Sequence, residues 1–265
     1  MTQKNVQAFY DGPGWEMAGM NTVDAVVNEN LTETALEYVS KVRNRISQRL
    51  GMGRALLDVG SGPIQYPEYV NYSQNFETRV CVDLSAKALM GAQKKIGPHG
   101  KFIVGDYLDI PTPEQAPFDG ATLINVLYHV KKERQEELVR KILNDLSPGK
   151  CLVVVYSNPR SFSSILTRAV VVIKHLFQSR LNRGRFKELS NPIYFFRFNI
   201  KFWQLFKDDA RVTIYPWRTF TPALEKILFR KYMGGKLLLK LLFEVEKFRW
   251  WRIFSEYQLI VLRKH

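Results

Sequence analysis

The sequence predicts a doubly wound α/β fold built on a mostly parallel sheet, and two observations support this. From residue 54 to residue 157, short runs that are apolar throughout alternate with segments of helical periodicity. Strands that are apolar on both faces are typical of a parallel sheet covered by helices on both sides. In addition, small or polar residues follow four of these runs, at the sheet edge where open α/β folds bind ligands.

The first predicted element is a helix from Thr32 to Leu50, which Thr32 can cap and Gly51 ends. Strands and helices then alternate. The expected strands are Arg54–Val59, Arg79–Asp83, Lys101–Val104, Asp119–Asn125 and Cys151–Tyr156. The expected helices are Tyr66–Phe76, Ser85–Ile96 and Lys131–Leu146. This order of elements predicts βαβ units, which make neighbouring strands parallel.

After Asn158-Pro159 the rhythm changes, and about a hundred residues precede the last predicted strand. Helices are expected at Ser163–Phe177 and Ile200–Phe206, from Pro222, and at Lys236–Phe248; extended segments are expected at Val212–Trp217 and Tyr257–Leu262. This part therefore reads as a helical insertion before the last strands of the sheet.

The composition is that of a soluble globular protein, with 46% hydrophobic and 24% charged residues in a chain of 265. The polar start shows no signal peptide, and no apolar run reaches the length of about 18 residues that a membrane span needs. The sequence thus favours a cytoplasmic protein. Cys81 and Cys151 lie in apolar runs. We expect two buried thiols, with a disulfide as the open alternative, and no metal site.

The net charge of +14 is unevenly distributed along the chain. Residues 1–156 carry 17 basic and 18 acidic residues, whereas residues 157–265 carry 22 and 7. The excess of positive charge in the second part predicts an anionic partner: a membrane surface, an anionic substrate or nucleic acid.

The predicted helix Lys236–Phe248 is one segment that could bind such an anionic partner. Its apolar residues fall on one face, and basic residues and two tryptophans accompany it. Three interpretations remain open: a core-packing helix with a solvated basic face, a helix lying on a membrane surface, or a nucleic-acid-binding segment. The apolar face consists of Leu237, Leu238, Leu241, Leu242, Val245 and Phe248.

The first motif that indicates chemistry is Leu56–Pro63, in which a strand runs into Gly60-Ser61-Gly62. Glycines at such a turn let the backbone approach a ligand closely. Asp83 closes the next strand, 21 residues past Gly62, where a carboxylate can accept hydrogen bonds from ribose hydroxyls. Gly105-Asp106 and Asn125 close the third and fourth strands. A nicotinamide or flavin site is the weaker alternative, because Gln65 occupies the position of its last glycine.

The segments LLDVGSGP, VCVDLS, GDYLDIP, FDGATLINVLYHV and LSPGKCLVVVY resemble successive motifs of class I S-adenosylmethionine-dependent methyltransferases, over roughly residues 50–157. The resemblance implies a Rossmann-like, seven-stranded sheet and S-adenosylmethionine as cofactor. The family usually has a third glycine where this chain has Ile64. The implied cofactor-binding residues are Asp58, Gly60, Ser61, Gly62, Asp83, Leu84, Asp106, Tyr107 and Asn125.

Two further residues are candidates through the same resemblance. His129, after the fourth strand, is the candidate general base for a hydroxyl acceptor. Its alternative role is a histidine that positions a loop. Tyr10, in an aromatic N-terminal segment with Trp15, resembles a lid over the cofactor, with plain packing as the alternative.

These observations predict three parts: an N-terminal lid and helix at 1–53, a cofactor-binding core at 54–157, and a basic acceptor-recognition segment at 158–265 that completes the sheet. The predicted activity is biosynthetic methyl transfer to a hydroxyl or amine of a small molecule. An anionic, glycosidic or lipid-linked biosynthetic intermediate is the kind of acceptor that we consider. An RNA methyltransferase and a non-catalytic binding protein of the same fold are the alternatives.

Overall fold

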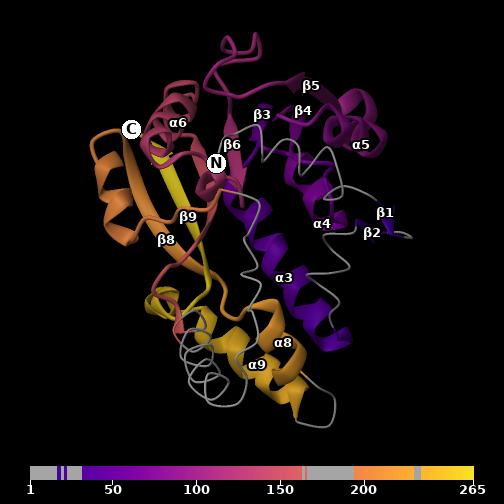
Figure 1. Ribbon diagram of the computed structural model, residues 1–265. Coiled ribbons are helices and arrows are strands. Elements are labelled where there is room, and N and C mark those ends of the chain that lie inside the picture. The colour runs from indigo at the N-terminus through magenta and orange to yellow at the C-terminus, as the bar shows by residue number, and fades with distance from the viewer. Residues whose placement is uncertain (1–16, 19–20, 23–31, 163–164, 166–193, 230–233) are drawn as a thin grey trace, which may run out of the picture.

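The computed structural model describes residues 17–18, 21–22, 32–162, 165, 194–229 and 234–265. A seven-stranded sheet runs through the molecule in the order β5-β4-β3-β6-β7-β9-β8 (Figure 1). Strands β5, β4, β3, β6 and β7 are parallel, and β9 runs antiparallel to both β7 and β8. The predicted doubly wound, mostly parallel α/β fold is confirmed.

Most predicted elements are present with small shifts at their ends. The sheet strands are β3 Gly53–Val59, β4 Phe76–Asp83, β5 Gly100–Val104, β6 Gly120–Ile124, β7 Cys151–Ser157, β8 Ala210–Arg218 and β9 Tyr257–Lys264. The α-helices are α3 Glu33–Leu50, α4 Pro67–Val70, α5 Ala86–Ile96, α6 Gln135–Asn144, α8 Pro222–Leu228 and α9 Gly235–Glu246. A separate pair of two-residue strands is formed by β1 Met17–Ala18 and β2 Asn21–Thr22.

Four predicted helices differ from the structure or lie outside it. The predicted helix Tyr66–Phe76 is the short α4 followed by a 3₁₀ turn, because β4 already begins at Phe76. The segment Ile200–Phe206 is the 3₁₀ helix η6, and the first turn of Lys131–Leu146 is the 3₁₀ helix η5, Lys132–Arg134. Most of the predicted helix Ser163–Phe177 lies outside the described residues.

The caps that the sequence predicts are formed. The Thr32 hydroxyl accepts a hydrogen bond from the Ala35 amide at the start of α3, and Ser85 does the same for α5 through the Ala88 amide. A polar cap satisfies an amide that has no partner inside the helix, which stabilises a helix by about 1 kcal/mol. The sequence alone therefore fixes where these two helices begin.

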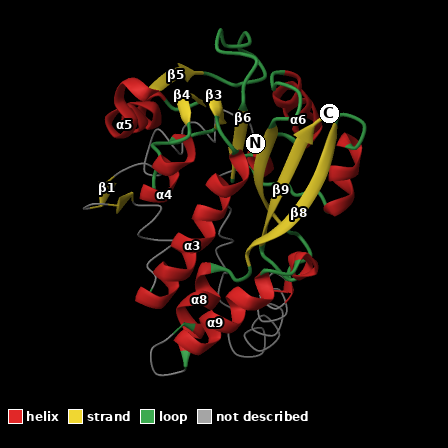
Figure 2. Cartoon of the chain, turned by 180° about the vertical axis from the view of Figure 1, so that it is seen from behind, coloured by secondary structure: helices red, strands yellow, loops and turns green. Residues whose placement is uncertain are grey.

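Helices cover both faces of the sheet. On one face, α6 and η6 pack against β3, β6, β7 and β9, with Trp203 fully buried. On the other face, α3 and α9 pack against β7, β8 and β9, while α5 packs against Cys81 of β4. Figure 2 shows β8 and β9 side by side at one edge of the sheet. Both α8 and α9 follow the carboxyl end of β8, at the lower end of the molecule in Figure 1.

The inner face of α9 differs from the one that its apolar pattern predicts. Leu239, Leu242 and Glu246 point inward, whereas Leu237 and Leu241 are exposed. Hydrogen bonds to a buried carboxylate explain this orientation of the helix. The buried carboxylate of Glu246 accepts hydrogen bonds from Tyr38 and Arg45 of α3 and from Thr219, and these bonds orient the helix. The apolar stripe is thus rotated by about a quarter turn from the buried face.

Both cysteines are free and buried, as predicted. Burial raises the pKa of the Cys81 thiol to about 12, so this thiol stays protonated and is unsuited to nucleophilic or metal chemistry. Across the described part of the chain, no helix meets the length and hydropathy that crossing a membrane requires. The described residues also hold no cluster of His, Cys, Asp and Glu that fits a metal ion.

Candidate active site

The loop after β3 turns sharply at two glycines. Gly60 and Gly62 have φ angles of 68° and 55°, in the left-handed region that glycine adopts without strain. The amide of Gly60 donates to the carbonyl of Val82, and the amide of Gly62 donates to Oδ2 of Asp83. These bonds attach the loop to the end of β4. The predicted glycine turn is therefore present at the carboxyl edge of the sheet.

Gly60 has a second reason to be a glycine. A Cβ atom at this position would lie 2.3 Å from Cγ2 of Val126, a residue at the end of β6. Such a contact is far inside van der Waals distance. The side chain of Val126 and the loop thus fit together only when residue 60 has no side chain.

We expect Gly60→Ala to lower the free energy of unfolding by about 2–4 kcal/mol, from the left-handed backbone and the overlap with Val126 together. Denaturant unfolding measures this. Gly51→Ala is the matched control, because Gly51 also has a positive φ of 82° but open space around it. Adding Val126→Ala should restore part of the stability of Gly60→Ala. Strictly additive losses in that double variant would contradict the assigned overlap.

Ile64 stands where the related family has its third glycine, and the structure places it in the left-handed backbone region. Its φ is 51°, which is rare for a β-branched residue. The side chain is fully buried with Leu89 and Ala92 of α5, and the Ile64 carbonyl accepts a hydrogen bond from Lys95. Burial of the side chain therefore offsets the backbone strain, and the tight first turn is kept without the glycine.

The Asp83 carboxylate is fixed at the end of β4 from both of its oxygens. Oδ1 accepts from the Ser85 amide, and Oδ2 accepts from the Gly62 amide, each at 2.9 Å. These two bonds hold the carboxylate in one orientation at the edge of the sheet. The arrangement joins the glycine loop to the residue that is expected to hold a ribose.

Asn125 provides the clearest sign of a ligand. Its φ is 60°, and its backbone amide donates to the carbonyl of Val155. Its side-chain Oδ1 is buried and accepts no hydrogen bond from the described residues. A buried amide oxygen without a partner costs roughly 1–3 kcal/mol unless something donates to it. A ligand that donates a hydrogen bond at this position would satisfy the oxygen.

Asp106 and Tyr107 are adjacent in sequence, but their side chains have different surroundings. The Asp106 carboxylate accepts from the Leu108 amide and pairs with Arg134 at 3.2 Å. The Tyr107 ring is 1% exposed and its hydroxyl donates to Asp145 at the end of α6. The Tyr107 side chain is therefore held against α6 and is not presented at the open edge of the sheet.

Asp58 lies inside the sheet. Its Oδ2 accepts two hydrogen bonds from the guanidinium of Arg79 on β4, at 3.0 and 2.5 Å. Its Oδ1 accepts from the hydroxyl of Thr122 on β6. The carboxylate thus ties three neighbouring strands together beneath the glycine loop. Ser61 and Leu84 lie, partly exposed, in the loops beside Gly60 and Asp83.

His129 follows β6, in the 3₁₀ helix η4, Leu127–His129. Its Nδ1 is 2.9 Å from the carbonyl oxygen of Tyr194. A carbonyl only accepts, so Nδ1 carries the hydrogen and Nε2 of the neutral ring has a free lone pair. Burial lowers the pKa of His129, although the hydrogen bond to Tyr194 opposes this. The ring is thus held neutral and in one tautomer.

The structure brings an unexpected segment, Tyr194–Phe198, to this position. The Phe196 amide donates to the Tyr128 carbonyl, and the Phe198 amide donates to the hydroxyl of Tyr156. Phe195 contacts the rings of Tyr128 and His129, and Arg197 donates to Ser157 at the end of β7. Sequence analysis missed these residues. The aromatic and basic run YFFRF was the only signal.

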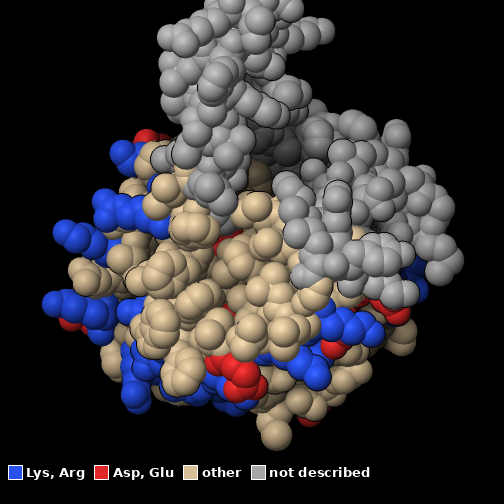
Figure 3. All heavy atoms as spheres, turned by 90° about the horizontal axis from the view of Figure 1, so that it is seen from below, with Lys and Arg blue, Asp and Glu red and all other residues tan. Residues whose placement is uncertain are grey.

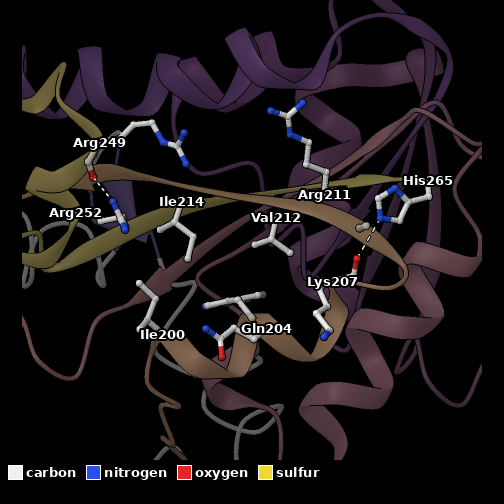
Figure 4. A pocket seen from close by; sticks show the side chains of 11 residues that line it. Ile200, Gln204, Lys207, Arg211, Val212, Ile214, Arg249, Arg252 and His265 are labelled. Carbon is white, nitrogen blue, oxygen red and sulfur yellow. Dashed lines mark hydrogen bonds between the residues drawn. The ribbon is translucent and has the colours of Figure 1, made fainter.

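A separate groove of about 670 Å³ lies on the outer side of β8 (Figure 4). Its floor includes Val212 and Ile214, and η6 forms one wall. Lys207 and Arg211 lie toward one end, and Arg249 and Arg252 lie at the other. The groove belongs to the basic part of the chain and contains none of the residues at the carboxyl edge described above.

Two candidate residues lie outside the described part of the chain. These are Tyr10 and Trp15 of the predicted lid. The residues that the structure does bring together at one edge are Gly60, Ser61, Gly62, Asp83, Leu84, Asp106, Asn125 and His129, from the ends of β3, β4, β5 and β6. These features define an α/β protein with a ligand site at the carboxyl edge of a parallel sheet.

Comparison with known proteins gives the family. Residues 57–154 match the family described as "Methyltransferase domain". The chain therefore contains a methyltransferase domain, and its cofactor is S-adenosylmethionine. No curated protein matches the sequence significantly.

Solved structures share the fold at low sequence identity. The DhpI-SAM-HEP complex has a TM-score of 0.59 and 12% identity, with 99% of both chains covered. N-methyltransferase NodS from Bradyrhizobium japonicum WM9, in complex with S-adenosyl-L-homocysteine, has a TM-score of 0.57 and 12% identity, with 98% of both chains covered. The small RNA methyltransferase HEN1 has a TM-score of 0.54 and 16% identity over 87% of this chain, which spans only 25% of the HEN1 chain.

Proposed function

We propose that this methyltransferase acts on a hydroxyl or amine of a small, anionic molecule, with His129 as the general base. The observation that carries the proposal is the position of His129. A neutral imidazole with one nitrogen fixed by the Tyr194 carbonyl lies beside the carboxyl edge of the sheet. The other nitrogen is able to take a proton from an acceptor group.

The residues at the carboxyl edge fit the cofactor. The unpartnered Oδ1 of Asn125 suits the amino group of the methionine moiety, and the Asp83 carboxylate, held at the end of β4 by two backbone amides, is of the acceptor type that ribose hydroxyls need. Asp106 is proposed to face the adenine, in competition with its ion pair to Arg134. S-adenosylmethionine, when bound, supplies an electrophilic methyl group on a sulfonium.

The chain's own residues position the acceptor and remove its proton. Methyl transfer is an in-line displacement, so holding the acceptor in line supplies a large part of the acceleration. Phe195 offers an apolar wall on the His129 side, held there by the hydrogen bonds of Tyr194–Phe198. Arg197, over the Phe195 ring, offers a cation that an anionic acceptor would share with Glu256, 3.8 Å away. This supports residues 158–265 as the acceptor-recognition part and a small anionic acceptor as its ligand.

The test is transfer of labelled methyl groups from S-adenosylmethionine to fractionated metabolite extracts and, separately, to RNA. Labelling of a small molecule supports the proposal. Labelling of RNA alone overturns it in favour of the nucleic-acid alternative. S-adenosylmethionine binding in calorimetry, with no acceptor labelled in any fraction, favours a non-catalytic binding protein of this fold.

The pH dependence of the reaction tests the role of His129. The pKa of His129 lies below the usual 6.5, so the neutral, basic form of the ring persists into mildly acidic solution. We expect kcat/KM to fall only when the pH drops below this lowered pKa of His129. We expect His129→Asn to lower kcat about 100-fold or more and to abolish this acidic limb. His265→Asn is the matched control at an exposed histidine. An unchanged profile in His129→Asn would assign the histidine to loop positioning instead.

A further inference from the structure

The outer side of α9 is apolar although the inner side already satisfies the core. Leu237 and Leu241 lie on one side of α9, four residues apart, facing away from Leu239, Leu242 and Glu246. Phe248 follows the end of α9, and its ring stacks with that of Trp250 in the 3₁₀ helix η8, Arg249–Ile253, at 6.4 Å between ring centroids. Ile253, the last residue of η8, is also exposed. We call these five exposed residues the α9–η8 face. Their exposed fractions lie between 52% and 65%.

Exposure of this degree at five large apolar side chains is unusual for an ordinary surface. Single exposed apolar residues need no explanation, but a contiguous group on one helix indicates an interaction site. Figure 3 looks at the end of the molecule that α8 and α9 form, and a broad uncharged area is visible there, edged by many Lys and Arg atoms and fewer Asp and Glu atoms. The face therefore has an apolar centre and a basic border.

The basic border lies along one flank of α9. Lys236, Lys240 and Lys247 are all exposed on that flank. Lys247 pairs with Glu244, whereas Lys236 and Lys240 have no acidic partner among the described residues. Apolar side chains bordered by lysines, with a tryptophan among them, are the composition that binds the interface of anionic lipid bilayers.

We infer that the α9–η8 face docks the enzyme onto an anionic membrane surface. The apolar side chains of this face enter the boundary between headgroups and acyl chains, and the lysines contact the anionic headgroups. Because α8 and α9 follow β8 at the carboxyl end of the parallel strands, the docked enzyme has its cofactor edge on the membrane side of the molecule. The inference concerns binding alone and holds whichever acceptor is methylated.

The test is flotation of the full chain with vesicles of phosphatidylcholine and with vesicles that also contain phosphatidylglycerol. The wild type should float only with the anionic vesicles. The triple variant with Leu237→Ser, Leu241→Ser and Phe248→Ser should partition onto the anionic vesicles at least about tenfold more weakly. The double variant with Lys236→Glu and Lys240→Glu should lose a similar factor. A blue shift of tryptophan fluorescence that disappears in Trp250→Ala would report insertion of that ring.

The matched control is Lys207→Glu, Arg211→Glu, which makes the same change of charge at the far end of the β8 groove. Arg211 lies seven residues before the end of β8, about 23 Å along the strand from the start of the loop to α8. This variant should float like the wild type. Equal loss in the control would mean that net charge alone attracts the protein, which overturns the docking face.

Three other outcomes also overturn the inference. The first is no flotation of the wild type with anionic vesicles at physiological ionic strength. The second is a lowered thermal midpoint in the triple Ser variant, because a face that is open to solvent should tolerate polar side chains. The third is a dimer in solution that the triple Ser variant dissociates, since a second copy of the chain would then cover the face. Methyltransferase activity is not a readout in any of these experiments.

Discussion

Replacing Arg79 by leucine is expected to lower the free energy of unfolding by about 3–5 kcal/mol. The substitution leaves the Asp58 carboxylate buried, with only the Thr122 hydroxyl as a partner. Both side chains of the ion pair are almost completely shielded from water, at 1% and 4% exposure. An unpaired buried charge has no compensating interaction, and this cost is a large part of a typical domain's stability of about 5–15 kcal/mol.

Chemical denaturation of the wild type, Arg79→Leu, Asp58→Leu and the double variant measures the coupling. The double variant should be more stable than the sum of the single losses predicts, because removing both charges leaves no unpaired ion. Glu37→Ala is the control, since Glu37 forms an exposed ion pair with Lys41 worth at most about 0.5 kcal/mol. Additivity of the two buried substitutions would refute the assigned interaction.

Asp83→Ala is expected to weaken S-adenosylmethionine binding about 100-fold or more, by the loss of at least two charge-assisted hydrogen bonds. Two effects act together. The variant removes the acceptor proposed for the ribose, and it frees the Gly62 and Ser85 amides that the carboxylate holds in place. Isothermal titration calorimetry with S-adenosylmethionine and with S-adenosylhomocysteine measures the change.

The control separates cofactor binding from folding. Asp119 also caps backbone amides of the sheet, those of Arg54 and Ala55, but it lies at the opposite edge from the glycine loop. Asp119→Ala should therefore keep cofactor affinity within about twofold while losing some stability. Wild-type affinity in Asp83→Ala would remove this residue from the proposed site.

Much of the fold could be predicted from the sequence because local signals and the tertiary structure agree. Thr32 and Ser85 cap the helices that they were expected to cap. The apolar runs became β3, β4, β6 and β7 because strands buried on both faces need such residues throughout. The sequence showed only that Ile64 occupies the position of a usual glycine. The structure was needed to show that its backbone is left-handed and that its side chain is buried against α5.

The sequence predicted which strand ends carry the candidate site residues, and the structure changed the surroundings of some of them. Gly60, Gly62, Asp83 and Asn125 lie at strand ends in the order that the sequence predicts. Asp58 is also an aspartate near the glycine loop, but its carboxylate is paired inside the sheet. Its partner, Arg79, comes from the neighbouring strand β4. The segment Tyr194–Phe198 could not be assigned, since its contacts with His129 and Tyr156 span about forty to seventy residues of chain.

The sequence by itself determined the class of fold and the edge of the sheet at which the candidate site residues gather, because strand periodicity and glycine turns are local properties of the chain. The tertiary structure decided which apolar residues of α9 face the core. Periodicity indicates that a helix has an apolar stripe, but it does not say which neighbour the stripe meets. Here the hydrogen bonds from Tyr38, Arg45 and Thr219 to Glu246 oriented the helix, and half of its apolar stripe was left facing solvent.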